Sequence, residues 1–221
     1  MALNAVSSGS NGLSRYYYTF KTREPALPTP TPNDYPILHF ASQEDWSAWL
    51  EEQHASSPGV WLQIYKAASG TSSVSYAEAL DVALCYGWID SHKKSLDEAS
   101  WIQKFTPRRS KSIWSKVNCE KAEAFIREGK MRPAGLAEVE RARADGRWAA
   151  AYESQSKASV PDDLQAELDR NPEAAAFFAT LNSVNRYAIL FRIQTAKKAE
   201  TRARRISEFV EMLARHEKIY P

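Results

Sequence analysis

Cysteine is scarce in this chain of 221 residues. Its two cysteines, Cys85 and Cys119, form no CxxC pair, which excludes a disulfide framework and indicates a reducing compartment. Long apolar runs are also missing: none approaches the roughly 18–20 residues of a membrane span, and the N-terminus lacks the apolar core of a secretory signal. We therefore expect a cytoplasmic protein with no membrane partner.

The sequence contains none of the short motifs that mark common nucleotide and catalytic sites. It has no GxSxG elbow, no P-loop and no GxGxxG, so a hydrolase triad, an NTPase or a nucleotide-dependent oxidoreductase has no support. The four histidines lie scattered without the spacing of metal ligands: His39, His54, His92 and His216. We therefore expect neither a metal nor a cofactor.

A strong charge of one sign is absent as well. The chain has 29 basic and 27 acidic residues, and its net charge of +2 is too small to indicate a nucleic-acid binder. Aromatic residues, by contrast, are plentiful, with seven tryptophans and ten tyrosines. This number exceeds the needs of a small core and leaves aromatic side chains available for a pocket.

Residues 1–35 differ from the remainder. Serine, glycine and asparagine dominate up to Ser14, and the prolines from Pro25 to Pro36 exclude a regular helix or a central strand. The sequence predicts an extended Ser/Pro-rich tail. Its aromatic patch at 16–20 is unusual for a free terminus. Besides a loose tail, the alternatives are a tail that docks on the body and one that docks on a second subunit, which would give a homodimer through the tail.

Residues 36–117 show alternating strand and helix signals. Runs rich in strand-forming residues lie at 37–40, 60–65, 88–94 and 101–106. Ser42 and the capping box Ser75-Tyr76-Ala77-Glu78 each begin a helix. The sequence predicts an α+β subdomain with a small, mostly antiparallel sheet and helices.

Residues 118–221 are predicted to be helical. Turn and capping signals divide this half into six helices, at 118–129, 133–145, from 161, from 172, at 184–193 and at 198–215. No internal repeat appears. The fold class is therefore α+β, with the sheet in the N-terminal half and a helical C-terminal half.

The stretch 87–118 carries the densest functional signal. It holds three tryptophans and an acid–imidazole pair. Between Ser100 and Asn118 it has no acid, and its cations are Lys104, Arg108, Arg109, Lys111 and Lys116. Cations and aromatics without carboxylate partners are typical of a surface that binds an anion or a π-face.

Several short motifs resemble the YdeI/OmpD-associated family, also called OmdA-like or bacteriocin-protection. They are GWID at 87–90, FTPR at 105–108, SIWS at 112–115, GKM at 129–131, DGRW at 145–148, PDDL at 161–164, NRY at 185–187 and Thr201-Arg202 to Ile206. The resemblance runs from about Leu38 to Ala214. It implies a role in protection or stress resistance without a defined activity.

Asp90 and His92 are the candidate catalytic residues. Two positions apart on a strand, they would share a face at about 6–7 Å, and a carboxylate beside an imidazole is a common acid–base device. The alternative is that Asp90 pairs with an arginine and His92 is merely exposed.

The candidate ligand-binding residues lie in two groups. Arg108 and Arg109 are suited to hold phosphate or carboxylate, aided by Ser112 and by the helix that opens near Asn118, with Trp88 and Trp114 supplying aromatic surface. The alternative for the arginines is a solvated loop, and that for Trp114 is the core. The second group is Arg186, Tyr187 and Arg202.

Arg202 lies in phase with the core stripe of the last helix. A charge on a buried face needs a carboxylate partner or a bound anion. One alternative is therefore an internal Arg202–Asp pair; the other is a site shared with the 87–118 stretch. For the shared site we expect the Arg202 guanidinium within about 8 Å of Asp90 or Arg108 in one ligand-sized pocket.

Three functions remain open. The first is a protein that binds a small anionic or aromatic ligand in a cleft between the two halves. The second is a cofactor-free isomerase, cyclase or lyase that uses Asp90 and His92, with arginines stabilising an oxyanion. Nucleic-acid binding through 104–116 is the weakest, since the whole chain carries little charge.

Overall fold

The computed structural model of the chain describes residues 35–221, and Tyr35–Pro221 groups as a unit by itself. The predicted extended tail and its aromatic patch lie outside the described residues, apart from Tyr35.

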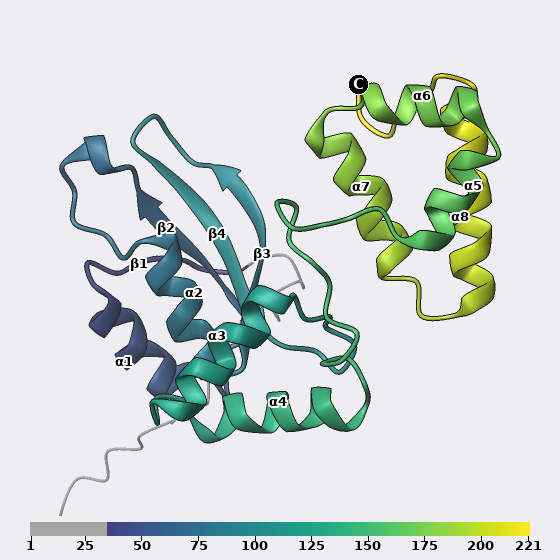
Figure 1. Cartoon of the computed structure of the whole chain (residues 1–221). Helices are drawn as coiled ribbons and strands as arrows, with labels where there is room; N and C mark the ends of the chain where they lie inside the picture. Colours follow the sequence, from purple (N-terminus) through teal and green to yellow (C-terminus); the bar gives the residue numbers. More distant parts are fainter. Residues whose placement is uncertain (1–34) are drawn as a thin grey trace, which may run out of the picture. The chain divides into compact units, whose positions relative to one another are not determined.

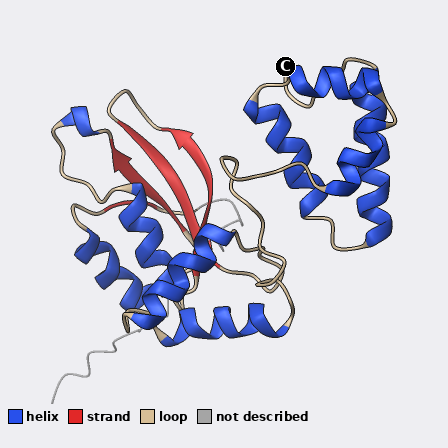
Figure 2. Ribbon diagram, in the orientation of Figure 1, coloured by secondary structure: helices blue, strands red, loops and turns tan. Residues whose placement is uncertain are grey.

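A four-stranded sheet forms the centre of the N-terminal part (Figures 1 and 2). Its strands are β1 (Ile37–His39), β2 (Val60–Tyr65), β3 (Trp88–Ser95) and β4 (Ser100–Pro107), in the order β1-β2-β4-β3. The β1–β2 pair is parallel, and the other two pairs are antiparallel. The strands are rich in Val, Ile, Trp and Tyr, and β3 and β4 form the hairpin predicted from the sequence.

Four helices accompany this sheet: α1 (Gln43–Gln53), α2 (Tyr76–Cys85), α3 (Lys116–Arg127) and α4 (Pro133–Ala144). The Ser42 side chain accepts a hydrogen bond from the Asp45 amide at the start of α1, and the Ser75–Glu78 capping box starts α2 as predicted. Helix α2 is central among them, since it contacts α1, α3, α4 and β3.

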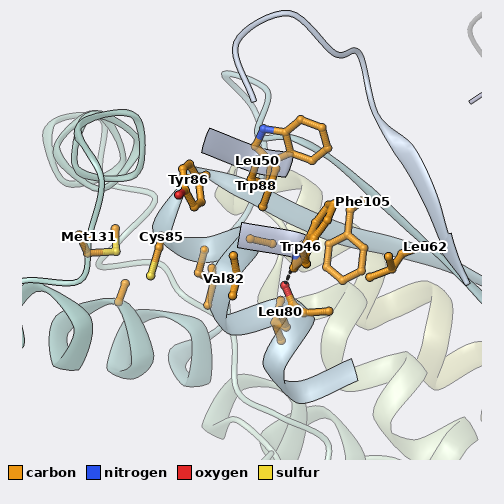
Figure 3. Close-up of a cluster of buried hydrophobic side chains, with 14 of the residues drawn as sticks. Trp46, Leu50, Leu62, Leu80, Val82, Cys85, Tyr86, Trp88, Phe105 and Met131 are labelled. Carbon is orange, nitrogen blue, oxygen red and sulfur yellow. Dashed lines mark hydrogen bonds between the residues drawn. The ribbon is translucent and has the colours of Figure 1, made fainter. Parts of the chain in front are cut away.

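The first hydrophobic core lies between these helices and the sheet. Trp46, Trp88 and Phe105 are fully buried and surround one another, with Leu50 and Leu62 beside them (Figure 3). The Trp46 indole donates a hydrogen bond to the Ala79 carbonyl at 3.1 Å, so its polar atom is satisfied inside the core. Fully buried large aromatics supply much of the apolar area that stabilises this part.

The remaining helices build a second core. They are α5 (Asp162–Asp169), α6 (Pro172–Thr180), α7 (Ser183–Gln194) and α8 (Ala199–Ala214). Its fully buried members include Leu164, Ile189, Ile193 and Leu213. No residue of the first core belongs to it.

The fold class is α+β, as predicted, with about 50% helix and 14% strand among residues 35–221. The predicted boundary at 117/118, however, falls inside the first core. Cys119, Ala122, Val139 and Ala142, all from α3 and α4, pack there with the sheet residues, and the second core begins only after Ala151. The amphipathic patterns of α3 and α4 do not reveal in the sequence which surface these helices cover, and in the structure they pack with the sheet.

Candidate functional site

The site begins at an irregularity in the β3–β4 hairpin. Asp90 pairs with Phe105 and Lys93 pairs with Gln103, so Ser91 and His92 together face Lys104 alone. Such a bulge bends its strand and redirects side chains, and bulges are frequent next to active sites. The prediction that Asp90 and His92 share a face assumed that side chains alternate regularly along β3. This alternation is interrupted at the bulge.

A cavity of about 600 Å³ lies at the bulge. Five predicted site residues line it: Asp90, His92, Arg109, Ser112 and Asn118. The other lining residues are Ile89, Ser91, Lys104, Thr106, Pro107, Ile113 and Tyr152. All of them come from residues 89–152, so the cavity belongs to the part built on the first core and is not a cleft toward the C-terminal helices.

Asp90 is held by a tyrosine from another element. The Tyr76 hydroxyl, at the first position of α2, donates to Asp90 Oδ2 at 2.8 Å. Burial, and after it this hydrogen bond, raises the pKa of Tyr76, so the phenol stays protonated as a donor. His92 is exposed and makes no side-chain hydrogen bond within residues 35–221, so the carboxylate is positioned by a tyrosine and not by the imidazole.

Arg108 lies behind the cavity wall. It is 5% exposed, its Nη1 donates to the Ile113 carbonyl at 3.2 Å, and its guanidinium carbon is 3.5 Å from the Trp114 ring centre. Burial lowers the pKa of Arg108 to about 10. Trp114 is 1% exposed and also contacts the Trp148 ring, so it belongs to the core, and it does not line the cavity.

The loop after β4 is fixed by its own serines. The Arg109 amide donates to Ser112 Oγ at 2.9 Å, and the Ser112 amide donates to the Arg109 carbonyl at the same distance. Ser115 caps α3 by accepting from the Asn118 amide. The exposed Arg109 side chain is thereby presented from an ordered turn at the cavity.

Trp88 lies away from the cavity. It is 1% exposed in the first core, and its indole donates to the His54 carbonyl at 3.2 Å. Its position on β3 directs it toward Trp46 and Trp49, so the predicted contact of Trp88 with a ligand has no geometric basis.

Arg186, Tyr187 and Arg202 do not line this cavity either. Arg202 forms a two-pronged ion pair with Asp163, with Nε–Oδ2 at 2.5 Å and Nη2–Oδ1 at 2.8 Å, and its Nη1 donates to the Ile193 carbonyl. Of the two alternatives for Arg202, the structure therefore shows the internal ion pair with an aspartate and not the site shared with the 87–118 stretch. Both partners of this pair belong to the C-terminal helices. Arg186 stacks over Phe178, and Tyr187 donates to the Glu153 carbonyl.

Three residues near the cavity were missed from the sequence: Lys104, Tyr152 and Arg147. Lys104 was noted as part of the basic run, yet its place opposite the bulge depends on strand register. Arg147 was noted within the DGRW motif without a role; it is 6% exposed, and its Nη1 donates to the Ser112 carbonyl at 2.8 Å. Tyr152 reaches the site through its pairing with Ser115, which carries no local signal.

Neither cysteine has the properties of a nucleophile. Cys119 lies in the first turn of α3, and burial raises its pKa to about 11 in spite of the opposing charge of Arg108. Burial likewise raises the pKa of Cys85 to about 11. Cys85 lines a different cavity of about 550 Å³, which contains none of the predicted site residues.

Within residues 35–221, no group of three or more His, Cys, Asp or Glu side chains is placed to hold a metal ion. The same part of the chain has no helix that is both long and apolar enough for a membrane span.

Two family models match different parts of the chain. Residues 157–216 match the model described as "Bacteriocin-protection, YdeI or OmpD-Associated", and residues 38–138 match a "Domain of unknown function (DUF8412)". No curated protein and no solved structure matches the chain. The C-terminal part of the chain thus matches the YdeI/OmpD-associated family, which confirms the resemblance there. The motifs from GWID to GKM fall under the second model, and DGRW at 145–148 lies between the two matched segments.

Proposed function

We propose that the chain binds a small anionic or aromatic ligand in the cavity at the β3–β4 bulge, in a protection or stress-resistance role. The carrying observation is the gathering of five predicted site residues, from a strand, a loop and a helix, on one cavity. Its volume of about 600 Å³ is that of a typical small-molecule site. The protection role rests on the family description alone.

The charges on the cavity favour an anion. Lys104 and Arg109 line it, and Asp90 is the one carboxylate among its lining residues. The positive charge of Arg108 lies directly behind, since Pro107 and Arg109 on either side of it are lining residues. Tyr152 adds an aromatic surface, and Ser112 and Asn118 add polar groups for orientation.

Arg109 is the residue to change first. It is exposed and lines the cavity, whereas Arg108 is buried and its removal would disturb folding. Thermal-shift screening against carboxylates, phosphates and aromatic acids should identify a ligand, and titration calorimetry should then compare the variants. For Arg109→Ala we expect roughly a 10–100-fold loss of affinity, the size of a lost charge-assisted hydrogen bond.

Lys111→Ala is the matched control, because Lys111 is an exposed cation of the same loop that does not line the cavity. Its affinity should stay within about twofold of the wild type, as for surface charges outside a contact. Equal affinity of Arg109→Ala and the wild type for every ligand found would contradict the proposal.

One observation favours an enzyme as the second candidate. Tyr76 holds Asp90 in the same cavity as Arg109, and a positioned carboxylate opposite a cation is the arrangement needed to move a proton and stabilise an oxyanion. In the same titrations, Asp90→Asn should retain ligand binding but lose turnover. Turnover that persists in Asp90→Asn would contradict the hypothesis that Asp90 is catalytic, and the binding protein would remain as the proposed function.

A further inference from the structure

Two buried arginines meet on one turn of backbone beside the ligand cavity. Arg108 donates through Nη1 to the Ile113 carbonyl, and Arg147 donates through Nη1 to the preceding carbonyl, that of Ser112. They are 5% and 6% exposed. Two guanidinium groups are thereby brought to consecutive carbonyls at a depth where charges are costly.

Both guanidinium groups retain hydrogen-bond donors without a partner. Nε and Nη2 of Arg108 and Nη2 of Arg147 are buried, and no group of residues 35–221 accepts from them. The Trp114 indole nitrogen, on the ring against which Arg108 stacks, is buried without a partner as well. Unsatisfied buried donors are rare in proteins, and four in one cluster indicate an acceptor supplied from outside the chain.

The charges at this cluster do not balance. Asp145 accepts from Arg147 Nε with both oxygens, at 2.8 and 2.7 Å, and so compensates that guanidinium. No carboxylate of residues 35–221 lies within ion-pair distance of Arg108, and burial together with the charge of Arg147 depresses the pKa of Arg108. Asp90 acts on Arg108 only from beyond ion-pair distance, so the two cations of the cluster have one directly paired carboxylate between them.

A small cavity adjoins the cluster. Its volume is about 60 Å³. Ile113, Arg147 and Tyr152 line it together with Ala150 and residues 194–197, among which Lys197 adds a further cation. Ile113 and Tyr152 also line the ligand cavity, so the two cavities share a wall. This space is large enough for a small ion and about a tenth of the volume of the ligand cavity.

We infer that a small monovalent inorganic anion of the halide type binds beside Arg147 Nη2, within the field of Arg108, as a structural ion of this part of the fold. The ion would accept a hydrogen bond from Arg147 Nη2, the free donor whose residue lines the small cavity, and its charge would offset that of Arg108. It is distinct in size and place from the ligand of the proposed function, and it would hold the turn 112–114 against the loop that carries Arg147.

Chloride is the probe for a test on the full chain. Urea unfolding of the wild type is followed by tryptophan fluorescence while sodium chloride replaces sodium gluconate at constant ionic strength, because gluconate is too large for the cavity. An ion that binds only the folded state raises the folding equilibrium constant by up to tenfold for each tenfold rise in its concentration above Kd. We expect this dependence in the wild type and its loss in Arg147→Met.

Arg204→Met is the matched control, since Arg204 is an exposed arginine paired with Glu208, and its chloride dependence should equal that of the wild type. Wild-type crystals soaked in bromide give a second readout that needs no variant, an anomalous peak within hydrogen-bonding reach of Arg147 Nη2. Stability independent of chloride, or crystals without this peak, would overturn the inference. Arg109→Ala separates the two proposals, because it should impair the organic ligand and leave the chloride effect intact.

Discussion

Arg108 shows how much a single residue depends on its surroundings. From the sequence it is one cation of an exposed basic run, yet the fold buries it against Trp114 with one hydrogen bond. Burial of an uncompensated charge costs several kcal/mol, so its retention at this depth needs an acceptor or an anion nearby. Its neighbour Arg109 is exposed and lines the cavity, so two adjacent arginines lie in different environments, one buried and one accessible to a ligand.

Gly135 has a purely steric role. A Cβ atom at this position of α4 would lie 2.2 Å from the Cys85 carbonyl oxygen and 2.8 Å from Met131 Cε, so α4 can approach the end of α2 only because the side chain is missing. On an open helix surface, glycine to alanine would stabilise by up to about 1 kcal/mol. Here the two helices must separate.

We therefore expect Gly135→Ala to lower the free energy of unfolding by about 1–3 kcal/mol, the usual cost of overpacking, as measured by urea denaturation. Gly129→Ala is the comparison: a Cβ there meets nothing within 4 Å, and its positive φ of 67° alone should cost about 1 kcal/mol. The steric account fails if Gly135→Ala is no more destabilising than Gly129→Ala.

At the scale of elements, local signals predicted well. The strand at 60–65, the capping box at Ser75 and the proline that opens α4 have their determinants within a few residues, and the structure contains each of them. The bulge at Ser91 and His92 could not be predicted in this way, because it depends on the register with β4 and carries no glycine. The sequence therefore predicted several residues of the cavity at this bulge, but not the cavity itself.

Arg202 was correctly placed in phase with the core stripe of α8, but periodicity does not identify the partner. That partner, Asp163, stands at the start of α5, 39 positions earlier. The hydrogen bond and charge of Arg202 lower the pKa of Asp163. A carboxylate whose pKa is lower in the folded than in the unfolded state stabilises the fold at pH values above its unfolded pKa of about 3.9. This contribution is lost as the pH falls through the folded-state pKa.

Asp163→Asn should accordingly lower the free energy of unfolding at pH 7 by less than about 1 kcal/mol, because the pair is partly exposed and screened. The difference from the wild type should persist at pH 5 and shrink as the pH falls below about 3.9 toward the lowered folded-state pKa, where the wild-type carboxyl takes up a proton. Urea unfolding followed by far-UV circular dichroism at pH 7, 5 and 3 measures it. Asp162→Asn controls for the charge in the first turn of α5, since Asp162 forms no ion pair within residues 35–221. A stability difference between Asp163→Asn and the wild type that does not change with pH would contradict the Arg202–Asp163 ion pair as its cause.

For the whole molecule, the sequence predicted a part built on a sheet and a part built of helices. It did not predict where along the chain one hydrophobic core gives way to the other. Helices α3 and α4 have amphipathic patterns that fit either core, and the choice is made by contacts such as that of Gly135 with Cys85, which are distant in sequence. The matched segments agree with the observed division, since one model ends at residue 138 and the other begins at 157. Assignment of helices to a core requires the surfaces they cover.

The two cores offer a test with two spectroscopic probes. All seven tryptophans lie between Trp46 and Trp148, whereas helix is distributed over both parts. Tryptophan fluorescence therefore reports the first core, and far-UV circular dichroism reports both. Leu213 is fully buried in the second core and Leu62 in the first, which makes them a matched pair for substitution.

We expect Leu213→Ala to lower the free energy of unfolding of the part built on the second core by about 2–5 kcal/mol. Because the two hydrophobic clusters share no member, this loss should create an early transition in circular dichroism and leave the midpoint of tryptophan fluorescence almost unchanged. Leu62→Ala should do the reverse and lower the fluorescence midpoint. Equal shifts of both probes in Leu213→Ala would show that the cores unfold as one cooperative unit, through links such as the Tyr152–Phe191 contact and the Tyr187–Glu153 hydrogen bond.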